Sequence, residues 1–446
     1  MEKLFQLKKH NTNVRTEVIG GLTTFFAMAY IIFVNPNFLS QTGMDHTAVM
    51  LATCVSAAIG CFLTAFMANV PFAQAPGMGL NAFFTYTICF GMGYTWQQGL
   101  AIVFISGLIF LAISISPIRK QIIDSIPAPL KAAISAGIGL FICLIGLLNA
   151  GIVTAGNNLL DLSSITSGPA LLALIGLFIM AVLYTYRVKG AILYGILGTW
   201  ILGMLCQVTG IYTPDVENGF YTLFPTLGIT DFSKLGETFG KCFTVDFDAV
   251  GIINFIVVIF SFLFVDIFDT LGTLIGVATK ADMLDEEGRL PGIRPALMAD
   301  AIATSFGAVL GTSTTTTFVE SASGVAVGGR TGLTSLTAAI LFGLSLFLSP
   351  IFLAIPSFAT APALIMVGFL MLTSITKIDF SDYTEAIPCF IAIIAMPFMY
   401  SISEGIAMGV ISYVVLNIAT GKAKEKHITP LMYVLAVLFV CKYIFL

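Results

Sequence analysis

The sequence predicts an all-α, polytopic membrane protein. Of its 446 residues, 57% are hydrophobic and only 10% are charged, and the mean hydropathy is +0.98. Soluble domains carry about 25% charged residues. Apolar windows of about 20 residues, the length at which a helix crosses a bilayer, recur along the whole chain. The short alternating segments of a transmembrane β-barrel are absent from the sequence.

The predicted spans fall into two halves of similar layout. In the first half they lie at about 18–34, 48–69, 97–116, 130–149, 169–186 and 190–209. In the second half they lie at about 250–276, 296–312, 331–355, 358–376, 384–400 and 402–420. The first apolar run is already a full span, so we expect no cleavable signal. A last run, 428–446, either spans the membrane or lies at its interface.

Two further apolar segments, 69–87 and 312–334, are interrupted by proline, glycine or hydroxyl residues. Such interruptions free backbone groups that must line a cavity or the protein interior, so both segments should be shortened or unwound helices. The second segment opens with a β-branched run, Thr312–Thr317, which favours a short extended segment over an ordinary loop. Residues 70–75 could supply its partner strand.

Short motifs recur between the halves at constant offsets. Gly60 matches Gly307 and Ala75-Pro76-Gly77 matches Ala322-Ser323-Gly324 at an offset of 247, whereas Ser116-Pro117-Ile118 matches Ser349-Pro350-Ile351 and Ala128-Pro129 matches Ala361-Pro362 at an offset of 233. Seven membrane elements per half is an odd number, so the second copy must be inverted. We predict about 14 transmembrane elements in two inverted seven-element repeats, a layout typical of transporters with a site near the membrane midplane.

Positive charge predicts the orientation. Lys and Arg gather in the N-terminal tail and at Arg119/Lys120, Arg187/Lys189, 280–294, Lys377 and 422–426. With 14 elements and a cytoplasmic N-terminus, all of these fall on the cytoplasmic side, and the acid-rich loop 211–249 falls outside. We therefore expect a multi-pass protein of the cell (inner or plasma) membrane.

The cysteines and histidines suggest no metal centre. Most of the eight cysteines lie in apolar segments without a CxxC pair, as small core residues do, and the three histidines are scattered. We expect no cofactor, no metal and no nucleic acid partner. There is no HExxH motif and no histidine inside a predicted span, which argues against an enzyme. No GxxxxGK[ST] motif indicates a built-in ATP-driven pump.

Three features carry the candidate chemistry. Asp266 and Asp269 are three residues apart in an apolar run and so share a helix face. Glu320, with Ser321 beside it, begins the second interrupted segment, and Asn81 lies in the first. A carboxylate inside a membrane costs about 2.5–3.5 kcal/mol on insertion scales unless it faces a cavity or partner, so these acids indicate function.

Structural roles compete for several polar residues. Asp266 and Asp269 could lie at a solvated helix end, and Asn81 could simply cap a helix or hydrogen-bond a neighbour. Asp300 is as well explained by a structural hydrogen bond as by substrate contact. Arg330 is better explained as an anchor for the cytoplasmic end of the half-helix than as a ligand group.

Four motifs resemble the AzgA-like purine nucleobase permeases of the nucleobase–ascorbate transporter group: VRTEVIGGLTTFFAMAYIIFVNP, APGMGLNAFF, FVDIFDTLGTLIGVA and GTSTTTTFVESASGVAVGGRTGLT. The resemblance covers essentially the whole chain. It implies a core domain of elements 1–4 and 8–11, a gate domain of elements 5–7 and 12–14, and half-helices at elements three and ten, each preceded by a short strand. It also implies that substrate binds between the half-helices at Asn81, Asp266 and Glu320, with Asp269 assisting transport.

On this layout residues 1–14 form a cytoplasmic tail. The core domain comprises 15–120 and 250–355; the gate domain comprises 121–210 and 356–446, the latter with the C-terminal apolar segment; and 211–249 is the extracellular loop. Relatives suggest a possible homodimer.

Purine chemistry agrees with these residues. A carboxylate accepts N–H groups from the edge of a purine, often two at once. Phe83 and Phe264 offer stacking faces, although 38 phenylalanines make that choice weak. Protonation of Glu320, Asp266 or Asp269 could link base movement to proton movement, which predicts proton symport across the bilayer. The core and gate layout implied by the resemblance predicts an elevator-type transporter, in which the core domain slides against the gate domain.

Asp266 favours guanine and hypoxanthine over adenine, because an aspartate only accepts and adenine presents N1 as an acceptor. The alternative is a carrier of the same fold for another base or anion, such as uracil, xanthine or sulfate. A channel is disfavoured by the internal repeat with two broken helices.

Overall fold

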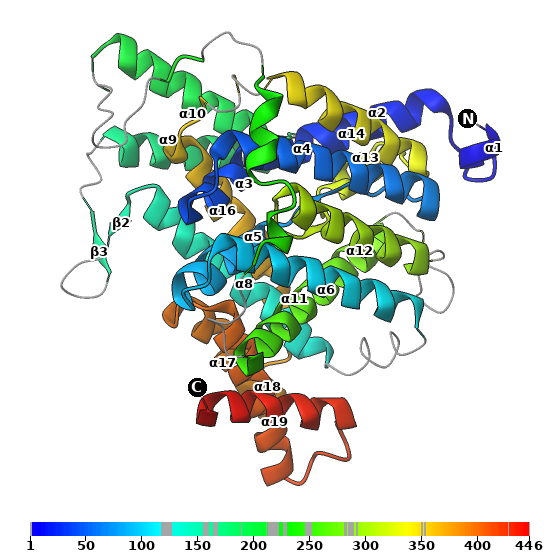
Figure 1. The fold of residues 1–446 in the computed structure, drawn as a ribbon, viewed down its shortest axis with the longest axis vertical. Coiled ribbons are helices and arrows are strands. Elements are labelled where there is room, and N and C mark those ends of the chain that lie inside the picture. The colour runs from blue at the N-terminus through cyan, green and yellow to red at the C-terminus, as the bar shows by residue number, and fades with distance from the viewer. Residues whose placement is uncertain are drawn as a thin grey trace.

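A computed structural model describes residues 2–116, 127–154, 160–163, 168–188, 190–210, 212, 223–225, 230–245, 252–280, 283, 290, 293–348, 351, 354–426 and 428–445. Helices dominate this part of the chain (Figure 1).

The first half contains the following elements. The α-helices are α1 (Glu2–Phe5), α2 (Val14–Met28), α3 (Ile31–Leu39), α4 (His46–Leu63), α5 (Met78–Ala82), α6 (Trp96–Ile115), α8 (Ala128–Asn149), α9 (Gly168–Thr185) and α10 (Ala191–Val208). The 3-10 turn η1 (Ser40–Thr42), the π-helical segments η2 (Thr64–Ala68) and η3 (Phe83–Gly91), and the strands β1 (Gln74–Pro76), β2 (Val153–Thr154) and β3 (Asp161–Leu162) complete it.

The second half has a similar sequence of elements. Its α-helices are α11 (Ile252–Lys280), α12 (Ile293–Leu310), α13 (Ser321–Ala326), α14 (Gly332–Ser345), α16 (Ser357–Leu372), α17 (Tyr383–Phe398), α18 (Ile402–Ala419) and α19 (Pro430–Phe445). The remaining elements are the strand β4 (Thr315–Thr317) and the 3-10 segments η4 (Phe232–Glu237), η5 (Lys241–Phe243), η6 (Leu346–Leu348) and η7 (Thr373–Lys377).

These helices identify a multi-pass membrane protein. Within the described residues, eight helical segments are long and apolar enough to cross a membrane, and several shorter apolar helices accompany them. The predicted and observed bounds agree closely, as at 97–116 against α6 and 169–186 against α9. The first predicted span differs, because it is divided into α2 and α3 by a bend at Ala29–Tyr30.

A two-stranded antiparallel ladder joins the two interrupted segments. β1 pairs with β4 so that Gln74 faces Thr317, Ala75 faces Thr316 and Pro76 faces Thr315. Backbone bonds extend the pairing on both sides, from Gly77 N to Thr314 O and from Phe318 N to Ala73 O, each 3.0 Å. The expected strand is confirmed for the last three residues of the Thr312–Thr317 run, and its partner overlaps the expected range 70–75 at residues 74 and 75 and extends to Pro76. A short helix follows each strand: α5, continued by η3, and α13.

Helices α4 and α12 occupy matching positions beside this ladder. They begin at His46 and Ile293 and end at Leu63 and Leu310, so one offset relates both ends. A Cβ on Gly60 would lie 2.8 Å from Gln74 Oε1, and one on Gly307 would lie 3.0 Å from Thr315 Oγ1. Each helix therefore needs glycine where it meets its own strand.

One expected motif match is wrong at the level of local structure. Ala75 and Pro76 lie in a strand, and Gly77 is the N-cap of α5, whereas Ala322–Gly324 lie within helix α13. The strand and short helix follow α12 more closely than they follow α4, because η2 is inserted after α4. The offset that relates the two long helices is therefore lost at the strands.

Close backbone contacts hold α2 against the second broken helix. A Cβ on Gly324 would lie 2.5 Å from the Gly20 carbonyl oxygen, and one on Gly21 would lie 2.5 Å from the Thr334 carbonyl oxygen. Both glycines are needed because backbone atoms, which cannot rotate away, occupy the space of a side chain. The packing brings the first span next to α13 and α14.

The C-terminal helix α19 lies across the lower end of the view in Figure 1 and packs against α18. The segment before it is fixed by Lys426, whose Nζ lies 2.5 Å from Asp382 and 2.9 Å from Glu385. The hydrogen bond from Lys426 holds the pKa of the Asp382 carboxyl well below its usual range. At 16 residues, α19 measures about 24 Å, less than a typical hydrocarbon core of about 30 Å.

Candidate functional site

The strand ladder and the two short helices form a polar interior between long apolar helices. All six ladder residues are buried, and the preceding Thr312, Ser313 and Thr314 are buried as well. The hydroxyls of Ser313, Thr315 and Thr316 make side-chain hydrogen bonds here, whereas those of Thr314 and Thr317 have no partner among the described residues. The candidate carboxylates and Asn81 lie on elements that pack against this ladder.

Asn81 lies in α5, and its side chain is completely buried. Its Oδ1 accepts a hydrogen bond from the Ser313 hydroxyl. Its Nδ2 has no hydrogen-bond partner among the described residues. Gly77 and Phe83 are the caps of α5, so Asn81 is not a helix cap, but it makes the hydrogen bond to a neighbour that was the other structural role expected of it. Its amide nitrogen retains two donors for another molecule.

Glu320 directly precedes α13 and is half-buried. The Tyr30 hydroxyl, at the bend between α2 and α3, donates to Glu320 Oε1 over 2.6 Å. Tyr30 is buried, and its ring lies 6.4 Å from the Phe318 ring. One carboxylate oxygen of Glu320 is thus held by a tyrosine that sequence reasoning missed. The sequence feature that could have indicated it is a tyrosine hydroxyl inside an otherwise apolar span, which needs a hydrogen-bond partner.

Asp266 lies in α11 and is completely buried, and neither of its oxygens has a hydrogen-bond partner among the described residues. It interacts electrostatically with Asp269 and Asp300, and Asp269 interacts with Glu320. Asp269 also lies beside the start of α5, because a Cβ on Gly77 would be 3.8 Å from Asp269 Oδ2. Asp266 is completely buried well inside α11, which excludes a solvated helix end for it. Asp266, Asp269 and Glu320 are together called the acidic group below.

Asp300 ties the ladder to α11. Its Oδ1 accepts from Gln74 Nε2 over 3.3 Å and its Oδ2 from Thr270 Oγ1 over 3.1 Å. Thr270 Oγ1 is in turn 2.7 Å from Thr316 Oγ1. Both oxygens of Asp300 thus accept hydrogen bonds from the protein, which is the structural role expected as the alternative to substrate contact.

The remaining candidate residues differ in their surroundings. Ser321 Oγ accepts from the Ala73 backbone N–H over 3.0 Å and so joins α13 to the segment before β1. The Phe83 ring stacks on Phe262 at a centroid distance of 5.6 Å, so one of its faces is occupied by protein. The side chain of Phe264 lies outside the described part of the structure. Arg330 Nη1 donates to the Val325 and Gly329 carbonyls, over 2.7 Å each, and so anchors the end of α13.

Glu17, a buried residue of α2, binds the segment that connects α13 to α14. Its carboxylate accepts from Arg330 N at 2.9 Å, from Thr331 N at 3.2 Å and from Thr334 Oγ1 at 2.6 Å. Arg330 and Thr331 directly precede α14 and Thr334 lies in its first turn, a position where the helix dipole favours a carboxylate. Glu17 thus holds the far end of the second broken helix in place.

Replacing Glu17 with Ala should destabilise the protein by about 3 kcal/mol, because a part-buried N–H group, a buried N–H group and a buried hydroxyl lose a charged acceptor. Thermal unfolding in detergent measures this loss. Glu17→Gln is the matched control and should lose less, since it retains one acceptor oxygen. Equal stability of Glu17→Ala and the parent protein would contradict this role.

Comparison with known proteins identifies the family. Residues 15–408 match the model of a family described as "Permease family". The chain belongs to this permease family. The permease is 43% identical over 456 residues to "Guanine/hypoxanthine permease PbuG" of Bacillus subtilis, covering 100% of both chains. It is 41% identical over 449 residues to "Adenine permease AdeP" of Escherichia coli, covering 100% of this chain and 96% of the relative.

The permease also resembles a solved structure, the transmembrane domain of the cyanobacterial bicarbonate transporter BicA. The TM-score is 0.63 at 16% identity, and the match covers 91% of this chain and 97% of the other. This likeness concerns the fold alone. The resemblance to the AzgA-like permeases, read from the four sequence motifs, is confirmed by the relatives.

Proposed function

We propose that this permease is a secondary active transporter that imports purine nucleobases, with guanine and hypoxanthine favoured over adenine. The supporting observation is the buried carboxylate of Asp266, which has no hydrogen-bond partner among the described residues, in a chain whose full-length relatives are named as purine permeases. A buried charge without a hydrogen bond is costly, so it is retained where a ligand or proton completes it.

The site offers groups that suit a neutral purine. Carboxylates at Glu320 and Asp266 accept N–H groups from the ring edge, and guanine and hypoxanthine present N1–H beside an O6 acceptor. Asn81 Nδ2 can donate to O6 or to a ring nitrogen. Adenine presents N1 as an acceptor, which an aspartate cannot satisfy unless one partner is protonated. The acids favour guanine and hypoxanthine for this reason.

Proton symport follows from the same acidic group. Asp266, Asp269 and Glu320 interact electrostatically in a buried region, where uptake of one proton relieves both burial and repulsion. If the base binds one protonation state better, the movements of proton and base are linked. We assign the proton to Glu320, Asp266 or Asp269.

We further propose 14 membrane elements in two inverted repeats, with a cytoplasmic N-terminus in the cell membrane. The matching ends of α4 and α12 and the two strand–short-helix units support the repeat. Helices α8, α9, α10, α16, α17 and α18 pack mainly on one another, and α2, α4, α6, α12 and α14 do the same. These two groups correspond to a gate and a core domain, which would move past each other in an elevator mechanism; a homodimer would fix the gate.

The alternative is a carrier of another base or anion, such as uracil, xanthine or sulfate, and the fold likeness to a bicarbonate transporter motivates it. The acidic group argues against an anion, because like charges repel in a site of low dielectric.

Purified protein in proteoliposomes tests both proposals. Radiolabelled hypoxanthine should accumulate under an inward proton gradient, and excess guanine should compete more strongly than adenine, uracil or sulfate. A protonophore should stop accumulation while allowing equilibration. Accumulation that is independent of the proton gradient would overturn symport. If uracil or sulfate competed with labelled hypoxanthine and the purines did not, purine transport would be overturned.

A further inference from the structure

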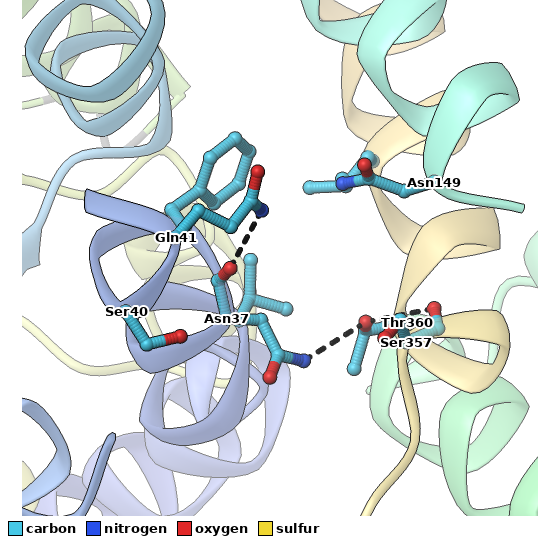
Figure 2. Close-up of a pocket in the computed structure, with 9 residues that line it drawn as sticks. Asn37, Ser40, Gln41, Asn149, Ser357 and Thr360 are labelled. Carbon is cyan, nitrogen blue, oxygen red and sulfur yellow. Dashed lines mark hydrogen bonds between the residues drawn. The ribbon is translucent and has the colours of Figure 1, made fainter. Parts of the chain in front are cut away.

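A polar cavity of about 300 Å³ lies between α3–η1 and the two helices α8 and α16, and no residue of the acidic group lines it. Figure 2 shows Asn37, Ser40 and Gln41 on one side and Asn149, Ser357 and Thr360 on the other. Three apolar residues, Val34, Phe38 and Leu364, complete the lining. The volume is at the lower end of the range for small-molecule sites.

The lining residues suit a small, neutral and planar molecule. Three amides and three hydroxyls supply both donors and acceptors, and none of the lining residues is charged. An anion or a cation would therefore lose its hydration without gaining a counter-charge. Phe38 adds an aromatic surface, and amide side chains pair well with the edges of nucleobases, as they do in nucleic acid recognition.

The polar groups on the α3–η1 side are held in position, and one long hydrogen bond joins them directly to α16. Asn37 Oδ1 lies 2.8 Å from His46 Nε2, and Gln41 Nε2 donates to the Asn37 carbonyl over 2.7 Å. Across the cavity, Asn37 Nδ2 reaches Thr360 Oγ1 at 3.3 Å, a long hydrogen bond. A ligand that bonds to both sides can replace this contact at little cost.

Two elements, α3 and η3, lie both at the cavity and near residues of the candidate site. Helix α3 follows the Tyr30 bend, and along a helix Tyr30 and Gln41 are about 16 Å apart. Tyr86, in η3 behind the first short helix, donates to Gln41 Oε1 over 3.0 Å and packs against Phe38. Arg15, Lys131 and Lys377 lie at the opposite ends of the lining helical segments from the cavity. Because the charge pattern places the basic ends on the cytoplasmic side, it places the cavity toward the outer face.

We propose that this cavity is an outer binding site for a neutral nucleobase, which receives the base before it reaches the acidic group. This rests on the proposed purine transport. Binding here bridges Asn37 and Gln41 of α3–η1 to Asn149 and Thr360 of α8 and α16. The acidic group is not needed for it.

Thiol protection tests the outer site. Ser40→Cys introduces a reporter in the cavity lining, and Gly236→Cys introduces a matched one on an exposed residue with open space around its Cα. Lys234 lies 3.7 Å from Asp45, so both reporters are at the same end of the molecule. Whole cells are treated with a membrane-impermeant maleimide over a range of hypoxanthine concentrations, alongside the parent protein, which corrects for native cysteines.

Hypoxanthine should slow labelling at position 40 and not at position 236. Protection should persist when Glu320→Gln is added, because that change disables the acidic group alone. Adding Asn149→Leu should raise the half-protecting concentration about tenfold, the effect of losing one amide contact.

Loss of protection in the Glu320→Gln background would overturn the outer site, since the signal would then come from the acidic group. Equal protection of both reporters would also overturn it. Hypoxanthine uptake by Ser40→Cys separates the two proposals. Uptake without protection would overturn the outer site and leave purine transport standing. Absence of both uptake and protection would overturn both proposals.

Discussion

Glu320→Gln will reduce hypoxanthine uptake at least about 100-fold while the protein remains folded in the membrane. The substitution keeps the size of the side chain but removes the charge that accepts from the base edge. Hydrogen bonds to a charged group contribute about 1.5–3 kcal/mol each, and two of them account for this loss. The Tyr30 hydroxyl can still bond to the amide oxygen, so folding should be little affected.

Two measurements separate binding of the base from carriage of the proton. If Glu320 binds the base, both net uptake and base-for-base exchange in preloaded proteoliposomes will fail. If it only carries the proton, exchange will persist while net uptake fails. Tyr30→Phe is the matched control: it removes one donor to Glu320 and keeps the ring against Phe318, so a loss of about tenfold is expected. Near-normal uptake by Glu320→Gln would remove Glu320 from the site.

The long helices could be predicted from the sequence because each is an apolar run with clear ends. Residues 130–149 and 402–420, for example, agree with α8 and α18 to within two residues. The extended Thr312–Thr317 run could be predicted from its β-branched composition, and Arg330 as an anchor from its place after a short helix. These features are local, and local patterns determine them.

Apart from the pairing of β4 with β1, contacts between distant segments could not be predicted. The Tyr30–Glu320 hydrogen bond joins residues 290 positions apart, and nothing near either residue encodes the other. Glu17 was visible only as part of a motif, although its carboxylate binds the start of α14. The repeat offset failed at the strands for a related reason: η2 adds a turn after α4 that the sequence pattern does not reveal.

The unpartnered state of Asp266 was equally hidden in the sequence. Asp266 and Asp300 are both aspartates within predicted apolar spans, and the sequence does not distinguish their environments. In the structure Asp300 accepts from Gln74 and Thr270, whereas Asp266 accepts from no described group. This contrast assigns a structural role to Asp300 and makes Asp266 the better candidate for contact with base or proton.

Asp266→Asn should therefore abolish uptake and at the same time stabilise the protein. A buried carboxylate without a hydrogen bond costs several kcal/mol, and a neutral amide of the same size removes most of that cost. The midpoint of thermal unfolding in detergent should rise by a few degrees. Uptake should fall about 100-fold, because the amide presents an N–H group where the base needs an acceptor.

Asp300→Asn is the matched control, because it changes the same atoms in a neighbouring buried residue. Its two oxygens already accept from Gln74 and Thr270, so an amide loses one of these bonds and the unfolding midpoint should fall. The two variants are thus expected to shift stability in opposite directions. A fall of similar size in both would show that Asp266 is a structural group like Asp300. Near-normal uptake by Asp266→Asn would show that transport does not need the Asp266 carboxylate, and would exclude Asp266 from the binding site.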